Sequence, residues 1–194
     1  MTLRATVAGA AGRLDRAAER VVDGRLRGRP RIDRAMYLAS ELGDFSLCWH
    51  LLGAARGLTS DAAAAEAVRL SVVLGAESAL VNGAVKQLVG RRRPIFDGER
   101  PHRLRTPRTS SFPSGHASAA FCAATLLAEG RRTWPLYYAA AAVVAASRVH
   151  VRIHHASDVV AGAALGLVLG RVARRAWPGP RAAPGRGVGN VDQE

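Results

Sequence analysis

A histidine and an aspartate, His154 and Asp158, stand four positions apart at the start of an apolar segment. Residues at this spacing share one face of a helix, so the carboxylate can accept the proton of one imidazole nitrogen and leave the other nitrogen as a nucleophile. The same spacing also occurs in ordinary helix-capping or stacking pairs. The pair therefore indicates nucleophilic catalysis only where other segments supply a site for the group under attack.

Two further patterns have the chemistry of a phosphate site. Pro-Ser-Gly-His at 113–116 opens an apolar run and is a plausible helix start, because the N–H that Pro113 lacks would be unpaired there. Gly115 lets the backbone approach a ligand, and the N–H groups at a helix start attract an anion. Cations stand at the edges of other runs, where they are also typical interfacial anchors; they are Lys86, Arg93 and Arg148.

Five apolar runs must position these residues. They are Met36–Ala55, Ala62–Val85, Pro113–Ala128, Trp134–Ser147 and Ala156–Val172. Their Ala and Leu content predicts helices. Only the first two reach the roughly 20 residues that a bilayer core needs, and both contain charges. The run at 134–147 has no polar face for water, which favours a membrane bundle over a soluble one. We therefore predict an all-α fold, an integral membrane helical bundle of about five spans.

The segments outside the runs complete the organisation. Residues 3–22 place their apolar side chains on one stripe, typical of an amphipathic helix on a membrane surface or on a soluble bundle. We divide the chain into a basic segment 1–35 that holds this interfacial helix, a membrane-embedded domain 36–177 and a disordered Gly- and Pro-rich tail 178–194. A ridge of small residues at spacing four favours close helix packing, so a homo-oligomer that packs through it is one partner we consider; its members are Gly162, Gly166 and Gly170.

Charge and cysteine usage exclude several classes of protein. The 194 residues include 28 Lys+Arg and 15 Asp+Glu, a formal net charge of +13. A chain this basic invites a nucleic-acid partner. We expect none, because no zinc-finger, RNA-recognition or helix-turn-helix pattern occurs and the arginines stand between apolar runs. Cys48 and Cys122 lie in apolar runs without ligand spacing, which argues against a disulfide framework or a Cys-based metal site. Residues 1–35 contain no apolar core before a cleavage site, so no secretory signal is expected.

Taken together, the patterns resemble the signature of the type 2 phosphatidic acid phosphatase superfamily, which also includes bacterial acid phosphatases and vanadium haloperoxidases. The matching residues span 86–158 and are Lys86, Arg93, Pro94, Pro113, Ser114, Gly115, His116, Ser147, Arg148, His154 and Asp158. The resemblance implies metal-independent hydrolysis through a phosphohistidine, without a cofactor. It implies a nucleophile at His154, oriented by Asp158, and a general acid and base at His116. The implied phosphate-binding residues are Lys86, Arg93, Ser114, Gly115 and Arg148.

We interpret the protein as a lipid-phosphate phosphatase of the cell envelope that acts on a phosphomonoester or diphosphate of a phosphatidyl or polyprenyl lipid. Two alternatives remain, a soluble-type acid phosphatase or vanadate-binding haloperoxidase relative, and a non-catalytic lipid-binding membrane protein. Three histidines close to these patterns match no signature position, and their roles stay open; they are His102, His150 and His155.

The distribution of cations suggests an orientation in the membrane. Membrane members of the family typically have six spans, whereas five runs are visible here, so the number of spans stays open. With five spans, residues 1–35, 86–112 and 148–154 share one side and carry 19 cations, against eight on the other side. The positive-inside rule then predicts a multi-pass protein of the cell membrane with its active site on the cytoplasmic side.

Overall fold

The computed structural model describes residues 3–96, 98–107 and 109–180, and every regular element within them is helical. This confirms the all-α prediction. The elements are α1 Leu3–Arg25, α2 Pro30–Leu42, the 3-10 turn η1 Asp44–Ser46, α3 Leu47–Gly57, α4 Asp61–Ser78, the π-helical segment η2 Ala79–Val85, α5 Lys86–Leu88, α6 Gly115–Leu127, α7 Trp134–His150 and α8 Ala156–Ala176.

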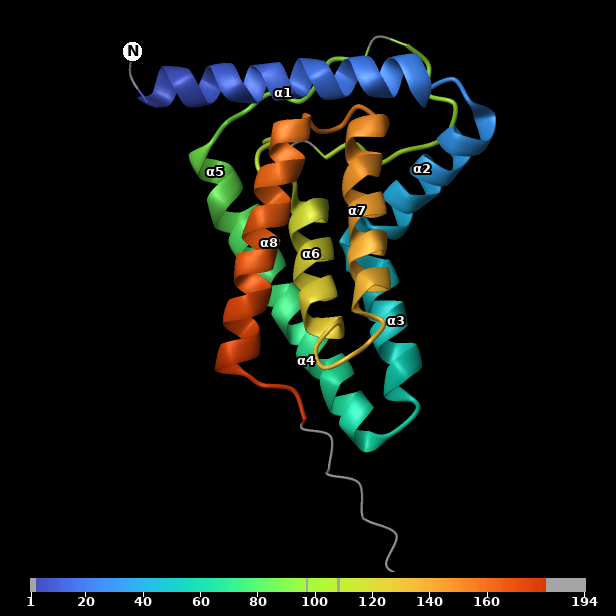
Figure 1. Ribbon diagram of the computed structural model, residues 1–194, viewed down its shortest axis with the longest axis vertical. Coiled ribbons are helices and arrows are strands. Elements are labelled where there is room, and N and C mark those ends of the chain that lie inside the picture. Colours follow the sequence, from blue (N-terminus) through green and yellow to red (C-terminus); the bar gives the residue numbers. More distant parts are fainter. Residues whose placement is uncertain (1–2, 97, 108, 181–194) are drawn as a thin grey trace, which may run out of the picture.

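Helix α6 forms the centre of the bundle and packs most extensively against α8 and α7 (Figure 1). Its side chains are mostly small, and Ala117, Ala120, Ala123 and Ala124 are fully buried. Small side chains let neighbouring helices approach closely, so α6 is surrounded although it is only 13 residues long. Helix α6 is thus held in place by its neighbours, and it contacts α4, η1, η2, α7 and α8.

The glycine ridge of α8 lies against α6 of the same chain. A Cβ added at Gly162 would stand 2.3 Å from the carbonyl oxygen of Ser114, and one at Gly166 would stand 2.1 Å from that of Ser118. Gly170 is likewise buried, against Thr125. The ridge is therefore occupied within the chain, and a homo-oligomer would have to use another surface.

Two helical stretches are long and apolar enough to cross a membrane. They are the continuous stretch Asp61–Leu88, made of α4, η2 and α5, and the helix α8. Helix α6 is apolar but shorter, at 13 residues. By length and composition, two helical stretches among the described residues could span a membrane, fewer than the five or so that we expected. Many apolar side chains nevertheless point outward from the bundle, including Leu51, Val68 and Leu136, each more than half exposed.

The first apolar run is broken in two, where a single helix was expected. Phe45 and Ser46 have φ of 53° and 58°, a left-handed conformation that is uncommon for residues other than glycine. Helix α2 therefore ends at Leu42 and α3 begins at Leu47, with the η1 turn between them. The break directs Asp44, which would be costly among lipid chains, toward the start of α6.

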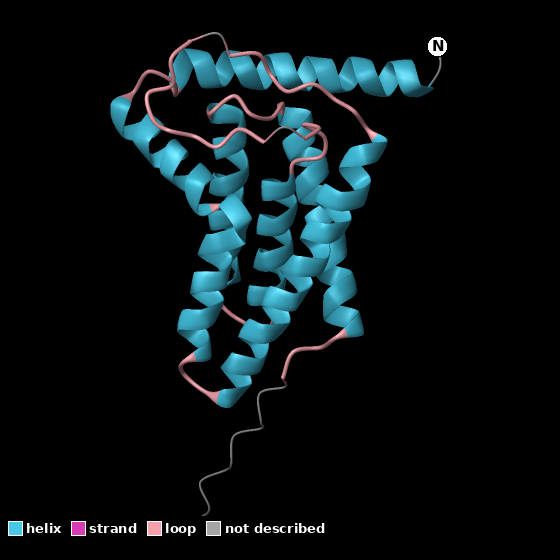
Figure 2. Cartoon of the chain, turned by 180° about the vertical axis from the view of Figure 1, so that it is seen from behind, coloured by secondary structure: helices cyan, strands magenta, loops and turns pink. Residues whose placement is uncertain are grey.

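Helix α1 lies across one end of the bundle, roughly perpendicular to the other helices (Figures 1 and 2). The loop between α5 and α6 and the turn between α7 and α8 lie at the same end, so the three basic segments share a side as expected. Val7, Leu14 and Val21 are exposed on α1. Contact of this stripe with a bilayer stays a prediction.

The two domain boundaries expected from the sequence can be compared with the helices and with the range of described residues. Helix α2 begins at Pro30, so the boundary expected at 35/36 falls inside a helix. Most of the predicted disordered tail, residues 181–194, lies outside the described residues.

Candidate active site

The residues of the three patterns meet beneath α1, at the amino end of α6. They come from the start of α5, the loop that follows it, the first turn of α6, the last turn of α7 and the turn before α8, which carry Lys86, Arg93, His116, Arg148 and His154. A cavity of about 430 Å³ opens here, and its lining includes Lys86, Gly115, His116 and His154.

His154 is held so that one ring nitrogen faces this cluster of cations. Its Nδ1 lies 2.7 Å from the carbonyl oxygen of Ser111, which can only accept a hydrogen bond. The proton therefore sits on Nδ1, and the lone pair of Nε2 points to Nη1 of Arg93, 3.2 Å away. Burial, together with the nearby charges of Arg148 and Arg93, lowers the pKa of His154 to about 3. The imidazole is thus neutral near neutral pH, as a nucleophile must be.

The expected helical pairing of His154 with Asp158 is wrong in its local structure. Helix α8 begins at Ala156 with His155 as its N-cap, so His154 precedes the helix. One carboxylate oxygen of Asp158 accepts the N–H of His155 at 2.9 Å, a capping contact, and stands 3.8 Å from Nδ1 of His154. Asp158 therefore lies beside the imidazole, but the backbone carbonyl of Ser111 makes the closer contact.

Arg148 is the most deeply placed cation of the site. Its side chain is fully buried, and Nη1 donates to the hydroxyl of Ser40 in α2. Nε and Nη2 have no hydrogen-bond partner among the described residues. Buried guanidinium donors without partners are costly, so they are well suited to the oxygens of an anion.

Arg93 is tied to the surrounding backbone, in contrast to Arg148. It donates to the carbonyl oxygens of Thr109, Ser110 and Ile153 at 3.1–3.2 Å. These contacts join the loop before α6 to the turn that holds His154. Arg93 is thus placed both to face a phosphoryl group and to hold the two segments together.

Lys86 reaches the cavity from the end of the π-helical segment η2. Its side chain is only 7% exposed, which is too buried for an anchor that extends to the water above a membrane. Single π-helical segments inside α-helices are frequent at functional sites. Here the segment also brings Asn82 so close to Gly115 that an added Cβ there would stand 2.9 Å from the Asn82 Oδ1.

The Pro-Ser-Gly-His pattern does start a helix, although two residues later than expected. Ser114 is the N-cap of α6, and its hydroxyl accepts the N–H of Ala117 at 3.4 Å. The Ser114 N–H donates to the carbonyl oxygen of Asp158 at 3.0 Å. The Ser114 hydroxyl accepts in this cap and keeps its own proton to donate, so it can meet an anion together with the first-turn N–H groups of Gly115 and His116.

His116 has a carboxylate partner that the spacing rules did not reveal. Its Nε2 lies 2.9 Å from Oδ1 of Asp44, in the η1 turn. The preceding Gly43 makes room for the ring, because a Cβ there would stand 2.8 Å from Cδ2 of His116. The only signal in the sequence was that Asp44 is a charge inside an apolar run, and such charges often mark functional sites.

Other residues near the site were also missed. Arg91 donates to Oδ1 of Asp158 at 2.6 Å. Glu77 in α4 is 4% exposed and lines the same cavity, and its Oε1 has no partner among the described residues. Arg91 could not be singled out among neighbouring arginines, whereas Glu77 was visible as a charge within the second run.

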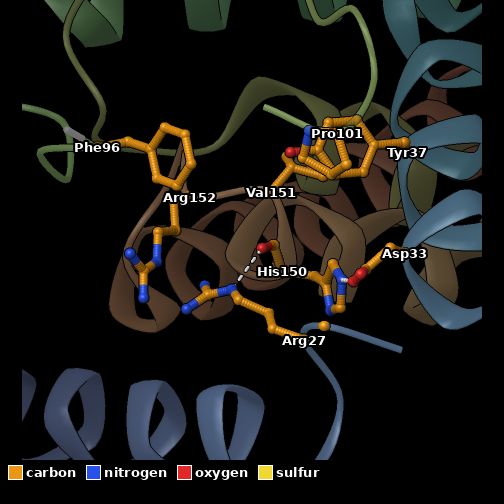
Figure 3. A pocket seen from close by; sticks show the side chains of 9 residues that line it. Arg27, Asp33, Tyr37, Phe96, Pro101, His150, Val151 and Arg152 are labelled. Atoms are coloured by element: carbon orange, nitrogen blue, oxygen red, sulfur yellow. Dashed lines mark hydrogen bonds and ion pairs between the residues drawn. The ribbon is translucent and has the colours of Figure 1, made fainter. Parts of the chain in front are cut away.

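Four histidines lie outside the signature. One of them, His50, lines the same cavity, with Nδ1 3.0 Å from Oγ of Ser71, and the other three are occupied elsewhere. His102 packs edge-on against Tyr37, with ring centroids 5.2 Å apart, and His155 caps α8. His150 faces Asp33 at 2.7 Å beside a separate cavity of about 290 Å³ (Figure 3). Among the described residues, no group of three or more His, Cys, Asp or Glu is arranged to hold a metal ion.

Comparison with known protein families gives one match over most of this region. The family model of the PAP2 superfamily matches residues 66–181, which include every residue of the three patterns. The match covers more than half of the chain.

Two mycobacterial relatives are similar in sequence. A decaprenylphosphoryl-5-phosphoribose phosphatase of Mycolicibacterium smegmatis is 32% identical over 144 residues, which cover 73% of this chain and 77% of the relative. The protein of the same name from Mycobacterium tuberculosis is 38% identical over 89 residues, 45% of this chain. That second match spans about half the length of the relative, at 49%.

Two solved structures have a similar fold. One is a transmembrane PAP2 type phosphatidylglycerolphosphate phosphatase from Bacillus subtilis, with a TM-score of 0.66 and 24% identity over 88% of this chain and 85% of the other. The other is LpxE of Aquifex aeolicus, with a TM-score of 0.66 and 22% identity over 81% of this chain and 92% of the other. At these identities the likeness concerns the fold.

Proposed function

This chain belongs to the PAP2 superfamily, and from that premise we propose that it is a membrane-embedded phosphatase that removes a terminal phosphate from a polyprenyl-type lipid. The observation that carries the proposal is the arrangement around His154. A neutral imidazole with its proton fixed on Nδ1 turns Nε2 toward Arg93, and Arg148 has unpaired buried donors in the same cluster.

In the first step, Nε2 of His154 attacks the phosphorus, and the bond from phosphorus to the lipid-side oxygen breaks. That oxygen takes a proton from His116 and leaves as an alcohol. Negative charge spreads over the equatorial oxygens of the phosphoryl group in the transition state. Lys86, Arg93, Arg148 and the first-turn N–H of Gly115 are positioned to stabilise it.

In the second step, a water molecule attacks the phosphohistidine. His116 takes a proton from this water, the phosphorus–nitrogen bond breaks, and inorganic phosphate leaves. His116 thus returns to its protonated form. Burial, with the charges of Arg148 and Lys86, lowers the pKa of His116, and the carboxylate of Asp44, 2.9 Å from the ring, offsets part of this cost of a charged imidazole.

Three features support a lipid rather than a soluble substrate. Apolar side chains are exposed around the bundle, two helical stretches have the length and composition of membrane spans, and the cavity lies at the end of the bundle. Such an end is where the head group of a lipid meets water. The mycobacterial relatives are named for a polyprenyl phosphosugar phosphate, so we propose this class as the first to test.

Phosphate release by the purified protein in detergent tests the function. The panel contains a polyprenyl-phosphoribose 5-phosphate, a phosphatidylglycerol phosphate, a phosphatidic acid and water-soluble p-nitrophenyl phosphate. We expect the highest kcat/KM for the polyprenyl substrate, with and without EDTA. Preference for p-nitrophenyl phosphate would favour a soluble-type acid phosphatase, and binding of these lipids without turnover would favour a non-catalytic protein. A strict requirement for added metal would contradict the mechanism.

We further propose that the protein is multi-pass, with the active site on the cytoplasmic side. Residues 1–35, 86–112 and 148–154, which together carry 19 of the 28 cations, lie at the α1 end, and the positive-inside rule favours the more basic side as the cytoplasmic face. In a background without Cys48 and Cys122, single cysteines at Glu99 and Arg132 report on the two ends of the bundle. An impermeant maleimide applied to intact cells should label position 132 and spare position 99. The reverse pattern would place the site outside.

A further inference from the structure

Helix α1 contacts the catalytic region through one carboxylate near its middle. Asp15 accepts the backbone N–H of Ser157 at 2.8 Å and the hydroxyl of the same residue at 3.0 Å. Its second partner is Arg91, whose Nη2 lies 2.8 Å from Oδ2 of Asp15. Burial alone would raise the pKa of Asp15, but the Ser157 and Arg91 contacts outweigh it, so its pKa lies below the usual range. Asp15 is therefore ionised where it meets the first turn of α8.

Arg91 connects this carboxylate to the active site. While Nη2 contacts Asp15, Nη1 donates to Oδ1 of Asp158 at 2.6 Å and to the Ser157 hydroxyl at 2.7 Å. Asp158 is fully buried and adjoins His154. A buried carboxylate needs such a partner, and the partner also determines its orientation.

The contacts form a continuous sequence from α1 to the nucleophile. Asp15 holds Arg91, Arg91 holds one oxygen of Asp158, and the His155 N–H holds the other. Because both oxygens are held, the position of Asp158 beside Nδ1 of His154 depends on residues outside the signature. Asp15 also stabilises the first turn of α8 directly, since a negative charge is favourable at the amino end of a helix.

We propose that Asp15 and Arg91 are positioning residues for the His154–Asp158 pair, so that α1 is a structural part of the active site as well as a surface helix. The inference deepens the proposed function and rests on it. It predicts that loosening α1 at Asp15 slows the chemical step while substrate binding is retained. Loosening α1 elsewhere should not have this effect.

The chain provides a matched control on the same helix. Asp23 pairs with Arg27 and, at 2.8 Å, with Arg152, at the end of α1 that docks on the carboxyl end of α7. There Arg27 donates to the carbonyl oxygens of Val149 and His150 at 2.7 Å, and Figure 3 shows the contact with His150. Asp15→Asn and Asp23→Asn therefore make the same chemical change at two docking points, of which only one reaches the site.

The experiment compares the steady-state kinetics of the two variants. We expect Asp15→Asn to lower kcat about 10- to 100-fold, as for other residues that orient a ligating or catalytic group, with KM within about twofold of wild type. Asp23→Asn should retain kcat within about twofold. Asp15→Glu, which keeps the charge, should recover part of the loss. Equal effects of the two Asn variants, or a loss in KM alone, would overturn the proposal.

A double-mutant cycle tests whether the two residues act as one unit. If Asp15 acts through Arg91, the double variant Asp15→Asn/Arg91→Gln should be little slower than Arg91→Gln alone. Losses that multiply would contradict this. Arg92→Gln, at an exposed neighbouring position, is the control for Arg91→Gln, and this pair tests the network if the Asp15 variant fails to fold.

Hydrogen exchange separates failure of this inference from failure of the proposed function, because it needs no substrate. In Asp15→Asn, amides of the turn and first helical turn at 153–160 should exchange faster than in wild type, whereas in Asp23→Asn they should not. Unchanged protection in Asp15→Asn would overturn the proposal even if the wild-type protein hydrolyses every lipid of the panel. Faster exchange in a protein that hydrolyses none would support the network and reject the activity.

Discussion

Replacing His154 with alanine is expected to abolish turnover, with a loss on the order of 10⁴-fold or more in kcat. The reason is that no other side chain in the cavity presents a neutral nitrogen toward Arg93 among the described residues. Phosphate release from the best lipid of the panel measures the loss. The protein should still fold and extract in detergent, although loss of the buried ring and its contacts with Ser111 and Arg93 lowers the thermal midpoint.

His102→Ala is the matched control for this experiment. His102 packs against Tyr37 and is not among the residues that line the cavity with His154, so its kcat should stay within about twofold of wild type. Acid-labile phosphate trapped on the wild-type protein by rapid quenching should be missing from His154→Ala. A His154→Ala protein with near-wild-type activity, or one that still traps such phosphate, would contradict the assignment of the nucleophile.

Arg148→Lys is expected to lower kcat/KM by about 10²- to 10³-fold, the usual effect of losing one donor to transition-state charge. The planar guanidinium bonds to Ser40 through Nη1 and keeps Nε and Nη2 for another partner. A lysine ammonium cannot contact Ser40 and a phosphoryl group at the same time, because it is a compact charge on a flexible chain. Vanadate, which takes the geometry of the phosphoryl group in transfer, should raise the thermal midpoint of wild type and have little effect on Arg148→Lys.

Arg69→Lys controls for the cost of altering a buried arginine. Arg69 in α4 is likewise buried, at 4% exposed, pairs with Glu129 at 2.9 Å and has two unpartnered donor nitrogens. It differs from Arg148 in pairing with Glu129 beyond the carboxyl end of α6, whereas the charge of Arg148 acts on His154 at the amino end. We expect Arg69→Lys to lower the thermal midpoint while it preserves kcat/KM and the response to vanadate. If both variants lost activity in proportion to their stability, the role of Arg148 would be structural only.

Local sequence patterns predicted the helices well where one physical signal dominated. Trp134 and Ala156 were expected as the first residues of two apolar runs, and α7 and α8 begin there. Both helices begin where the composition becomes apolar, and they continue three and four residues beyond the predicted ends, to His150 and Ala176. The same reasoning missed the break at Phe45 and Ser46, because neither residue type favours a left-handed backbone. Tertiary contacts hold that conformation, and no local preference reports it.

The sequence by itself determined which residue types stand at the ends of the helices, since a histidine, a cation or a helix start is visible from type and spacing alone. Only the tertiary structure decided which groups support them. Asp44 meets His116, Asp15 meets Arg91 and Ser157, and the Ser111 carbonyl selects the tautomer of His154. These partners are separated by 43 to 142 positions along the chain, and no periodicity links residues so far apart. Contacts of that kind arise only when the helices pack, because packing alone brings their polar ends to one place.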